Sequence, residues 1–329
     1  MTILVTGAAG FIGAHVVQAL LAHGQSVIGF DNLNDYYPAQ LKRDRLRALC
    51  SNGDFAFEQV DIASSSDLIT ALKGRQPKKI IHLAAQAGVR YSLQNPAAYN
   101  EANLNGHFAM LELALQFEID SMIYASSSSV YGGNTKIPFS ETDQTDDPVS
   151  FYGATKKSNE MMSQSYARLY GLPLTGLRFF TVYGPWGRPD MAYWIFAEKI
   201  LEDQPINIFN NGKMSRDFTY IDDIVSGILS ALERPANSLG LSIPHRIYNL
   251  GNDRPEPLMK MITNIEAGIG KEAEKIYQPM QKGDLERTWA DIERARSELG
   301  YAPKVTLQEG LMRFTDWFKT YRQAADSSR

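Results

Sequence analysis

The first half of the chain alternates short apolar runs with amphipathic stretches. Short apolar runs that end at glycine or aspartate are typical of buried parallel strands. Between them apolar residues recur at helical spacing, as at Ile12, Val16 and Leu20, and that stretch ends at Gly24, a C-terminal helix signal. The expected strands are Ile3–Val5, Ser26–Phe30, Phe55–Val60, Lys79–Leu83, Ser121–Ala125 and Leu174–Arg178, and the clearest helices are Ile12–His23, Asn103–Phe117 and Tyr152–Tyr170.

This alternation predicts an α/β fold with a Rossmann-type, doubly wound parallel sheet covered by helices on both faces. The pattern changes after Gly184, where proline, glycine and asparagine interrupt the chain and helices stand alone. We therefore expect a smaller α/β substrate lobe in the C-terminal part. The predicted nucleotide-binding domain is residues 1–180 plus about 215–250, and the predicted second lobe is about 181–214 plus 251–329.

Composition and charge exclude several classes of protein. With 329 residues, of which 44% are hydrophobic, the chain can bury a full core. A net charge of −4 does not indicate the positively charged surface that binding of nucleic acid requires. The single Cys50 excludes an intramolecular disulfide and a multi-cysteine metal site, and no metal is expected. The sequence has no visible signal peptide and no apolar run near the roughly 18 residues of a membrane span, so we expect a cytoplasmic protein.

The run VTGAAGFIG, from Val5 to Gly13, has the glycine spacing of a dinucleotide-binding loop. Gly7 allows the tight turn out of the strand, Gly10 lets the backbone approach a pyrophosphate, and Gly13 lets helix and strand pack closely. The N-terminus of the following helix offers free N–H groups to the phosphates. Asp31 ends the second strand, where it suits the ribose hydroxyls and repels a 2′-phosphate, so the predicted cofactor is NAD rather than NADP.

Residues at the ends of the next strands are expected around the same cofactor. Asp61 and Ile62 suit the adenine amine and the adenine ring face, although an aspartate there is also an ordinary turn residue. Small residues follow His82, which is itself expected to be a packed strand residue. The residues predicted to contact NAD are Gly7, Gly10, Phe11, Ile12, Gly13, Asp31, Asn32, Asp61, Ile62, Leu83, Ala84, Ala85, Asn103, Ser126, Tyr152, Lys156 and Phe179.

Tyr152 and Lys156, spaced Y-x-x-x-K downstream of a run of serines, form the candidate catalytic pair. A free tyrosine has a pKa near 10. The ammonium of Lys156, one helical turn along the same face, and a positive nicotinamide ring are expected to lower that pKa. Ser127 is expected to donate or relay a hydrogen bond to the reacting oxygen. These groups suit a phenol that accepts an alcohol proton while a hydride leaves the same carbon.

On these motifs the chain resembles the extended short-chain dehydrogenase/reductase superfamily, with its NAD-dependent epimerases and dehydratases, over essentially its whole length. The matching segments are Thr6–Gly13, His82–Ala85, Ser126–Gly132, Tyr152–Lys156, Leu177–Phe180 and Arg216–Ile221. The segments that resemble the UDP-glucuronate 4-epimerases in particular are Asp31–Tyr37, Phe180–Met191, Gly283–Asp284 and Thr288–Asp291. The resemblance implies oxidation of C4 of a UDP-hexuronate by bound NAD, rotation of the 4-keto sugar and return of the hydride to its other face, in the service of polysaccharide biosynthesis.

The serine run distinguishes epimerases from the dehydratases and decarboxylases of the superfamily that the chain resembles. The dehydratases carry an Asp–Glu pair where this chain has Ser128 and Ser129, and the decarboxylases carry a Glu at the place of Ser129. Elimination and assisted loss of CO2 therefore lack their usual catalyst, while small hydroxyls leave room for a substrate carboxylate. Thr181 and Arg188 are expected to add contacts. Two other functions stay open: an epimerase of the UDP-glucose or UDP-N-acetylglucosamine type, and a non-catalytic NAD-sensing protein.

The second lobe is expected to anchor the UDP part of the substrate. Arg216 suits the diphosphate, because a planar bidentate donor matches phosphate oxygens. Asp284 is the candidate for the uridine ribose, while the arginine expected just before it is replaced by Gln281 and Lys282. Each of these residues also fits an ordinary surface or core position. The residues predicted to contact the substrate are Arg90, Ser127, Ser128, Ser129, Tyr152, Thr181, Arg188, Ile208, Phe209, Arg216 and Asp284.

Two of the expected helices carry apolar residues on more than one side. A helix that is apolar on two sides needs a second surface to cover it. The resemblance implies that this surface is a second copy of the chain, in a two-fold homodimer built as a four-helix bundle. The apolar positions are Phe108, Leu111 and Leu115 in the first helix and Met161, Met162, Tyr166 and Leu169 in the second.

Overall fold

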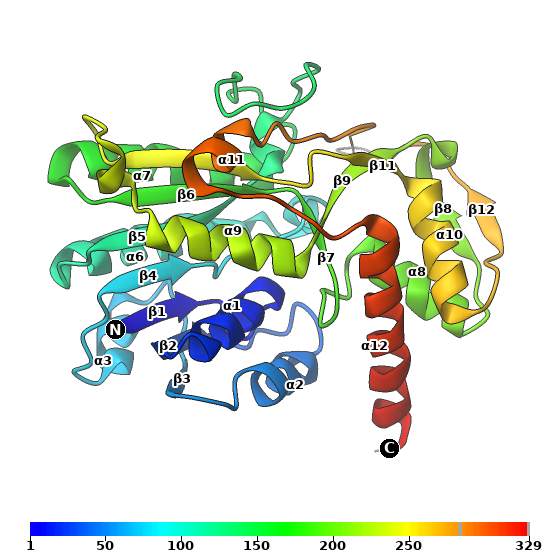
Figure 1. Cartoon of the computed structure of the whole chain (residues 1–329), viewed down its shortest axis with the longest axis horizontal. Coiled ribbons are helices and arrows are strands. Elements are labelled where there is room, and N and C mark those ends of the chain that lie inside the picture. The colour runs from blue at the N-terminus through cyan, green and yellow to red at the C-terminus, as the bar shows by residue number, and fades with distance from the viewer. Residues whose placement is uncertain (282–284, 328–329) are drawn as a thin grey trace.

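A parallel sheet in the strand order β10-β6-β5-β4-β1-β2-β3 forms the centre of the molecule (Figure 1). The computed structural model describes residues 1–281 and 285–327. The strands are β1 (Thr2–Thr6), β2 (Ser26–Asp31), β3 (Phe55–Gln59), β4 (Lys79–His82), β5 (Ser121–Ser127), β6 (Leu174–Phe179) and β10 (His245–Leu250). From β1 the strand order runs in both directions, so the topological switch point lies between β1 and β4. The predicted Rossmann-type parallel sheet is confirmed.

The helices of this part are α1 (Phe11–Ala22), α2 (Ala39–Leu49), α3 (Ser65–Leu72), α4 (Tyr91–Gln94), α5 (Pro96–Tyr99), α6 (Gly106–Gln116), α7 (Phe151–Tyr170) and α9 (Ile221–Glu233). Successive residues of β1 face opposite sides of the sheet. Ile3 and Val5 share a core with α1 and α9, while Leu4 shares a second core with α3 and α6. Apolar residues on both faces thus explain why the strand is a continuous hydrophobic run.

Two boundaries differ from the sequence prediction. β5 continues beyond Ala125 to Ser127, so two serines belong to the strand rather than to the loop after it. The helix expected from Asn103 begins with a π-helical turn, Asn100–Asn105, before α6 starts at Gly106. π-Helical turns occur often at functional sites, and here the turn adjoins the loop that follows β4.

The second lobe lies to one side of the large sheet (Figure 1). Its elements are β7 (Thr181–Tyr183), α8 (Ala192–Leu201), β8 (Ile206–Ile208), β9 (Ser215–Tyr220), β11 (Pro255–Pro257), α10 (Leu258–Ile269), β12 (Lys275–Tyr277) and α12 (Leu307–Ser327). Helix α11 (Glu293–Leu299) packs instead against β10 and α9 of the large-sheet part (Figure 1). Helix α10 packs against α8 and α12, β9 pairs with β7 and β11, and β8 pairs with β12. The chain enters this lobe after β6, returns to the large sheet for α9 and β10, and leaves again. The domain limits proposed from the sequence stay a prediction.

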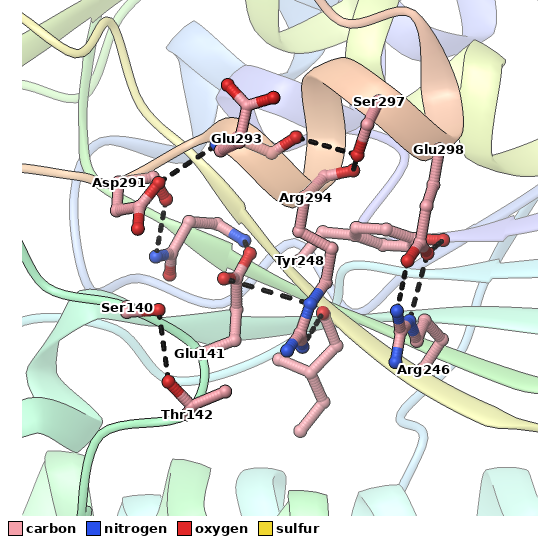
Figure 2. A network of polar contacts seen from close by, with 12 residues as sticks. Ser140, Glu141, Thr142, Arg246, Tyr248, Asp291, Glu293, Arg294, Ser297 and Glu298 are labelled. Atoms are coloured by element: carbon pink, nitrogen blue, oxygen red, sulfur yellow. Dashed lines mark hydrogen bonds and ion pairs between the residues drawn. The ribbon is translucent and has the colours of Figure 1, made fainter.

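A polar network fastens α11 to the edge strand β10 (Figure 2). Glu298 is ion-paired with Arg246 and accepts a 2.8 Å hydrogen bond from the Tyr248 hydroxyl. Arg294 donates to the carbonyl of Ile247 at 3.1 Å. The network thereby holds the C-terminal segment against the sheet that carries the site. Within the described part of the chain, no helix is long and apolar enough to cross a membrane.

Candidate active site

The loop between β1 and α1 is too tight for a side chain at two of its glycines. A Cβ on Gly13 would lie 2.0 Å from the carbonyl oxygen of Gly7. A Cβ on Gly7, whose φ is +71°, would lie 2.8 Å from the amide nitrogen of Ala84. Helix α1 begins at Phe11, so its first N–H groups have no partner within the helix. This bare backbone cradle at a helix N-terminus fits the pyrophosphate of a dinucleotide.

A cavity of about 440 Å³ opens at the carboxyl ends of the strands and includes this cradle. Ligands of doubly wound folds bind at this place, outside the strand ends at the switch point. The predicted site residues that line the cavity are Gly7, Gly10, Phe11, Ile12, Gly13, Asp31, Asn32, Asp61, Ile62, Leu83, Ala84, Ala85, Ser126, Ser127, Ser128, Ser129, Tyr152, Lys156, Phe179, Thr181, Arg188 and Arg216. The structure therefore brings the cofactor, catalytic and carboxylate candidates into one space.

Asp31 lies at the end of β2 beside the glycine loop. Its carboxylate accepts hydrogen bonds from the backbone nitrogens of Leu33, at 2.8 Å, and Ala9, at 3.2 Å. Burial raises the pKa of Asp31, and the charge of Lys42, 3.9 Å away, opposes that shift. Lys42 comes from α2 and also lines the cavity, but the sequence analysis gave it no role. The position of Asp31 on the cavity wall fits the expected contact with a ribose.

Tyr152 and Lys156 project from the first turns of α7 into the cavity. The side chain of Ser150 caps this helix by accepting a 3.0 Å hydrogen bond from the nitrogen of Gly153. The Nζ of Lys156 donates to the carbonyl oxygen of Ala125, at 3.0 Å, and burial lowers the pKa of Lys156 to about 8. The cap fixes the start of the helix, and the spacing of four residues places both side chains on one face.

The pKa of Tyr152 departs from the sequence expectation. We expected Lys156 to lower it, but burial raises it, because a phenolate removed from water loses solvation. A hydrogen bond with Ser127 and the charge of Arg188 oppose this effect. The ammonium of Lys156 is engaged with the backbone of β5 instead. The protein's own groups therefore hold Tyr152 protonated, and the positive nicotinamide ring is the expected source of a lower pKa.

Arg188 and the serine run line the same cavity as Tyr152, and Ser127 and the charge of Arg188 both act on the Tyr152 hydroxyl. Nε of Arg188 donates to Oδ1 of Asp190 at 3.0 Å, and the Tyr36 hydroxyl donates to Oδ2 of the same carboxylate at 3.0 Å. The nitrogen of Ser129 donates to the hydroxyl of Ser127 at 3.1 Å. A guanidinium and small hydroxyls that line one cavity suit a carboxylate ligand.

The remaining predicted contacts lie elsewhere. Asn103 is behind the cavity wall, because its amide accepts from the nitrogen of Gln86 and donates to its carbonyl, at 2.8 and 3.0 Å. Asn103 thus supports the loop after β4 from behind. Ile208 is buried in the hydrophobic core, since β8 is covered by its lobe. The guanidinium of Arg90 lies 5.3 Å from the ring centroid of Phe209, and both are outside the lining. Asp284 lies outside the described residues.

Several lining residues were missed by the sequence analysis. Tyr36 and Tyr37 follow β2 inside a segment that carried the resemblance, yet no role was assigned to either. Leu285 and Thr288 line the cavity from the C-terminal segment, next to Arg216. Nη1 of Arg216 donates to the carbonyl of Glu286 at 3.1 Å, which fastens that segment to β9. Only the resemblance to a family could have pointed to these positions, because isolated aromatic and aliphatic residues carry no local signal.

The comparisons with known proteins agree with this site. Residues 3–251 match the model of the NAD dependent epimerase/dehydratase family. The chain is 44% identical to the probable UDP-glucuronate 4-epimerase of Rhizobium meliloti, over 98% of this chain and 99% of that protein. It is 47% identical to UDP-glucuronate 4-epimerase 4 of Arabidopsis thaliana, over 98% and 76%. The crystal structure of the UDP-glucuronic acid 4-epimerase from Bacillus cereus, in complex with UDP-glucuronic acid and NAD, matches with a TM-score of 0.90 and 38% identity, over 98% of this chain and all of that one. The chain therefore belongs to the NAD-dependent epimerase/dehydratase family.

Proposed function

We propose that this protein converts UDP-glucuronate to UDP-galacturonate by epimerisation at C4, with bound NAD. The observation that carries the proposal is that Arg188 lines the same cavity as Ser127, Ser128, Ser129 and Thr181, a group that we call the carboxylate corner. These groups can bind a C6 carboxylate, and the acids that drive dehydration or decarboxylation in related enzymes are replaced by serines. Relatives and a solved structure named for UDP-glucuronate support the same substrate.

The chemistry divides between the cofactor and the residues of the chain. The glycine loop and Asp31 would hold NAD, which would supply an acceptor for the C4 hydride and a donor that returns it to the opposite face of the sugar. With its pKa lowered by the positive nicotinamide ring, Tyr152 would accept as a phenolate the proton of the C4 hydroxyl when the carbonyl forms, and return it when the carbonyl is reduced. Ser127 holds the same oxygen by a hydrogen bond. The reaction is therefore balanced within one cycle, with no net oxidation and no proton lost.

The carboxylate corner protects the intermediate. A 4-keto uronate is a β-keto acid, and it loses CO2 when its carboxylate can pass electrons into the ring carbonyl. We propose that Arg188, Thr181 and the serine hydroxyls hold the carboxylate in an orientation that prevents this flow. They also select the substrate, because a neutral 6-hydroxyl group makes weaker hydrogen bonds with a guanidinium than a carboxylate does.

The most direct test is an assay without added NAD. The purified protein is incubated separately with UDP-glucuronate, UDP-glucose and UDP-N-acetylglucosamine, and the products are separated by chromatography. We expect UDP-galacturonate from the first sugar, with little 4-keto pentose product. A preference for UDP-glucose would establish the neutral-sugar epimerase instead. Stoichiometric NAD without turnover of any sugar would establish an NAD-sensing protein.

We also propose that the protein is a homodimer. Helices α6 and α7 leave apolar side chains exposed on neighbouring surfaces, with Phe108 50%, Met161 59% and Leu169 68% exposed. A second copy would cover these residues in a two-fold, four-helix bundle, as the family resemblance implies. The cytoplasmic location and the role in polysaccharide biosynthesis are parts of the same proposal. The location is supported by the buried free thiol of Cys50, and the biosynthetic role by the family resemblance alone.

A further inference from the structure

Arg45 is a fully buried guanidinium on α2 that joins two loops of the active site. Its Nη1 donates to the carbonyl of Ala9, in the glycine loop, at 3.1 Å. Its Nε donates to the carbonyl of Trp186 at 2.8 Å, and its Nη2 to the carbonyl of Gly187 at 2.7 Å. Ala9 belongs to the cofactor cradle, whereas Trp186 and Gly187 directly precede Arg188. One side chain thus ties the cofactor loop to the loop that carries the carboxylate-binding arginine.

The turn that Arg45 holds has an unusual backbone. Trp186 has a φ of +61°, in the left-handed region that side chains other than glycine rarely adopt. Such a conformation persists only where its surroundings enforce it. Two carbonyls of this turn point at a single guanidinium, whose planar fork fixes their directions. Arg45 therefore fixes the backbone direction of residues 186–187, which directly precede Arg188.

Two tyrosines after β2 complete the attachment. The hydroxyl of Tyr37 accepts a 2.7 Å hydrogen bond from Nη1 of Arg45, and the Arg45 guanidinium lies 5.3 Å from the Tyr37 ring centroid. The hydroxyl of Tyr36 donates to Asp190, which is ion-paired with Arg188. The carboxylate-binding loop is thus held on both sides of Arg188, at residues 186–187 by Arg45 and at residue 190 by Tyr36.

We propose that Arg45 is a positioning residue for recognition of the substrate carboxylate, acting through the loop that carries Arg188. The inference rests on the proposed UDP-glucuronate activity. Because Arg45 also holds Ala9, it sets the distance between the carboxylate corner and the cofactor cradle. A displaced carboxylate weakens uronate binding and frees the 4-keto acid to lose CO2, whereas binding of a sugar without a carboxylate is unaffected. Positional errors near 1 Å at a reacting centre cost about 100-fold in rate.

The test compares Arg45→Lys and Arg45→Met with Arg47→Met, a control on the exposed part of the same helix. We measure kcat and KM for UDP-glucuronate, the fraction of decarboxylated product, the NAD content, and the inhibition constant of UDP-glucose as a competitor. Arg45→Lys should lower kcat/KM for the uronate about 10- to 100-fold and raise the decarboxylated fraction. The inhibition constant of UDP-glucose should stay within about twofold, and Arg47→Met should resemble wild type.

A second comparison separates positioning from a merely structural role. In an Arg188→Ala background, Arg45→Lys should cause no further loss of uronate binding, because residues that act through one another are not additive. Additive losses, or equal losses for both sugars, would overturn the proposal. If the Arg45 variants do not fold, Tyr37→Phe removes one partner of Arg45 and should shift the ratio of uronate to UDP-glucose affinity in the same direction; an unchanged ratio overturns the proposal. A wild-type protein that ignores UDP-glucuronate would instead refute the proposed function itself.

Discussion

The Nζ of Lys156 lies 3.0 Å from the carbonyl oxygen of Ala125, so the ammonium one helical turn after Tyr152 is held by the backbone of β5. Burial lowers the pKa of Lys156 to about 8, from 10.5 for the free side chain. The positive charge is therefore costly to the folded protein at neutral pH. This cost links the chemistry of the site to the stability of the fold.

Lys156→Met should stabilise the cofactor-free protein at pH 7 while abolishing turnover. Folding makes the ammonium less favourable than it is in the unfolded chain, so the destabilisation is fully present below pH 8 and disappears as pH rises toward 10.5. The shift bounds the gain at about 3 kcal/mol. Urea unfolding at pH 7 and at higher pH should show an advantage of the variant that shrinks as pH rises. Lys157→Met is the matched control, because the ammonium of Lys157 lies 3.7 Å from the Glu160 carboxylate. A Lys156→Met protein that is less stable than wild type at pH 7 would contradict the argument.

Tyr152→Phe should retain NAD and UDP-sugar while losing about 10²- to 10⁴-fold in turnover, the usual worth of a general acid–base group. The phenyl ring keeps the edge contact that Tyr152 makes with Tyr99, whose ring centroid is 6.0 Å away. Binding should therefore survive the substitution. Steady-state kinetics with isothermal titration distinguish the two effects. A variant with more than a tenth of the wild-type rate would remove Tyr152 from the mechanism.

The purified protein should carry NAD and not NADP. The carboxylate of Asp31 faces the cavity with its backbone partners already in place, so it can accept from ribose hydroxyls and repels a 2′-phosphate. Denaturing the protein and identifying the released nucleotide by mass spectrometry tests this. Asp31→Ala should be isolated with less NAD. Recovery of NADP, or activity that depends on added NADP, would be decisive against the assignment.

Arg188→Ala should weaken turnover of UDP-glucuronate far more than any residual turnover of UDP-glucose. The guanidinium is the charged partner proposed for the C6 carboxylate, and removing a charged hydrogen bond costs about 1.5–3 kcal/mol, or roughly 10- to 100-fold. The fraction of decarboxylated product should rise as well. Arg168→Ala, an exposed arginine on α7, serves as control. Unchanged uronate kinetics would show that the carboxylate binds elsewhere.

Met161→Glu should convert a dimer into a folded monomer. The proposed interface buries the exposed apolar side chains of α6 and α7, and a carboxylate placed among them would lose its hydration. Light scattering at micromolar concentration measures the mass directly. Ile276→Glu, on β12 of the second lobe, should leave the mass unchanged. A wild-type protein that is monomeric under these conditions would refute the four-helix bundle.

The sequence predicted the elements whose signals are local. Apolar runs located the strands from β1 to β6 to within about two residues, since a buried parallel strand is apolar on both faces. The placement of Asn103 depends on a π-helical turn that no periodicity predicts. Ile208 and Phe209 are adjacent in sequence, yet one enters the core and the other packs under Arg90. The short strands of the second lobe pair with strands far away in the sequence, as β12 does with β8. The local sequence therefore could not predict which strands pair.

The aromatic contacts of Trp186 have a consequence for the biosynthesis of the protein. The Trp186 ring centroid lies 5.0 Å from that of Trp317 and 5.3 Å from that of Tyr321, both on α12. The cofactor cradle precedes α12 in the chain and therefore leaves the ribosome earlier, whereas the turn before Arg188 acquires these neighbours only after α12 has emerged. Because domains fold progressively during translation, a nascent chain can form its dinucleotide loop long before the carboxylate corner is complete. On the proposed function, selectivity for a uronate is thus acquired only after α12 has been synthesised.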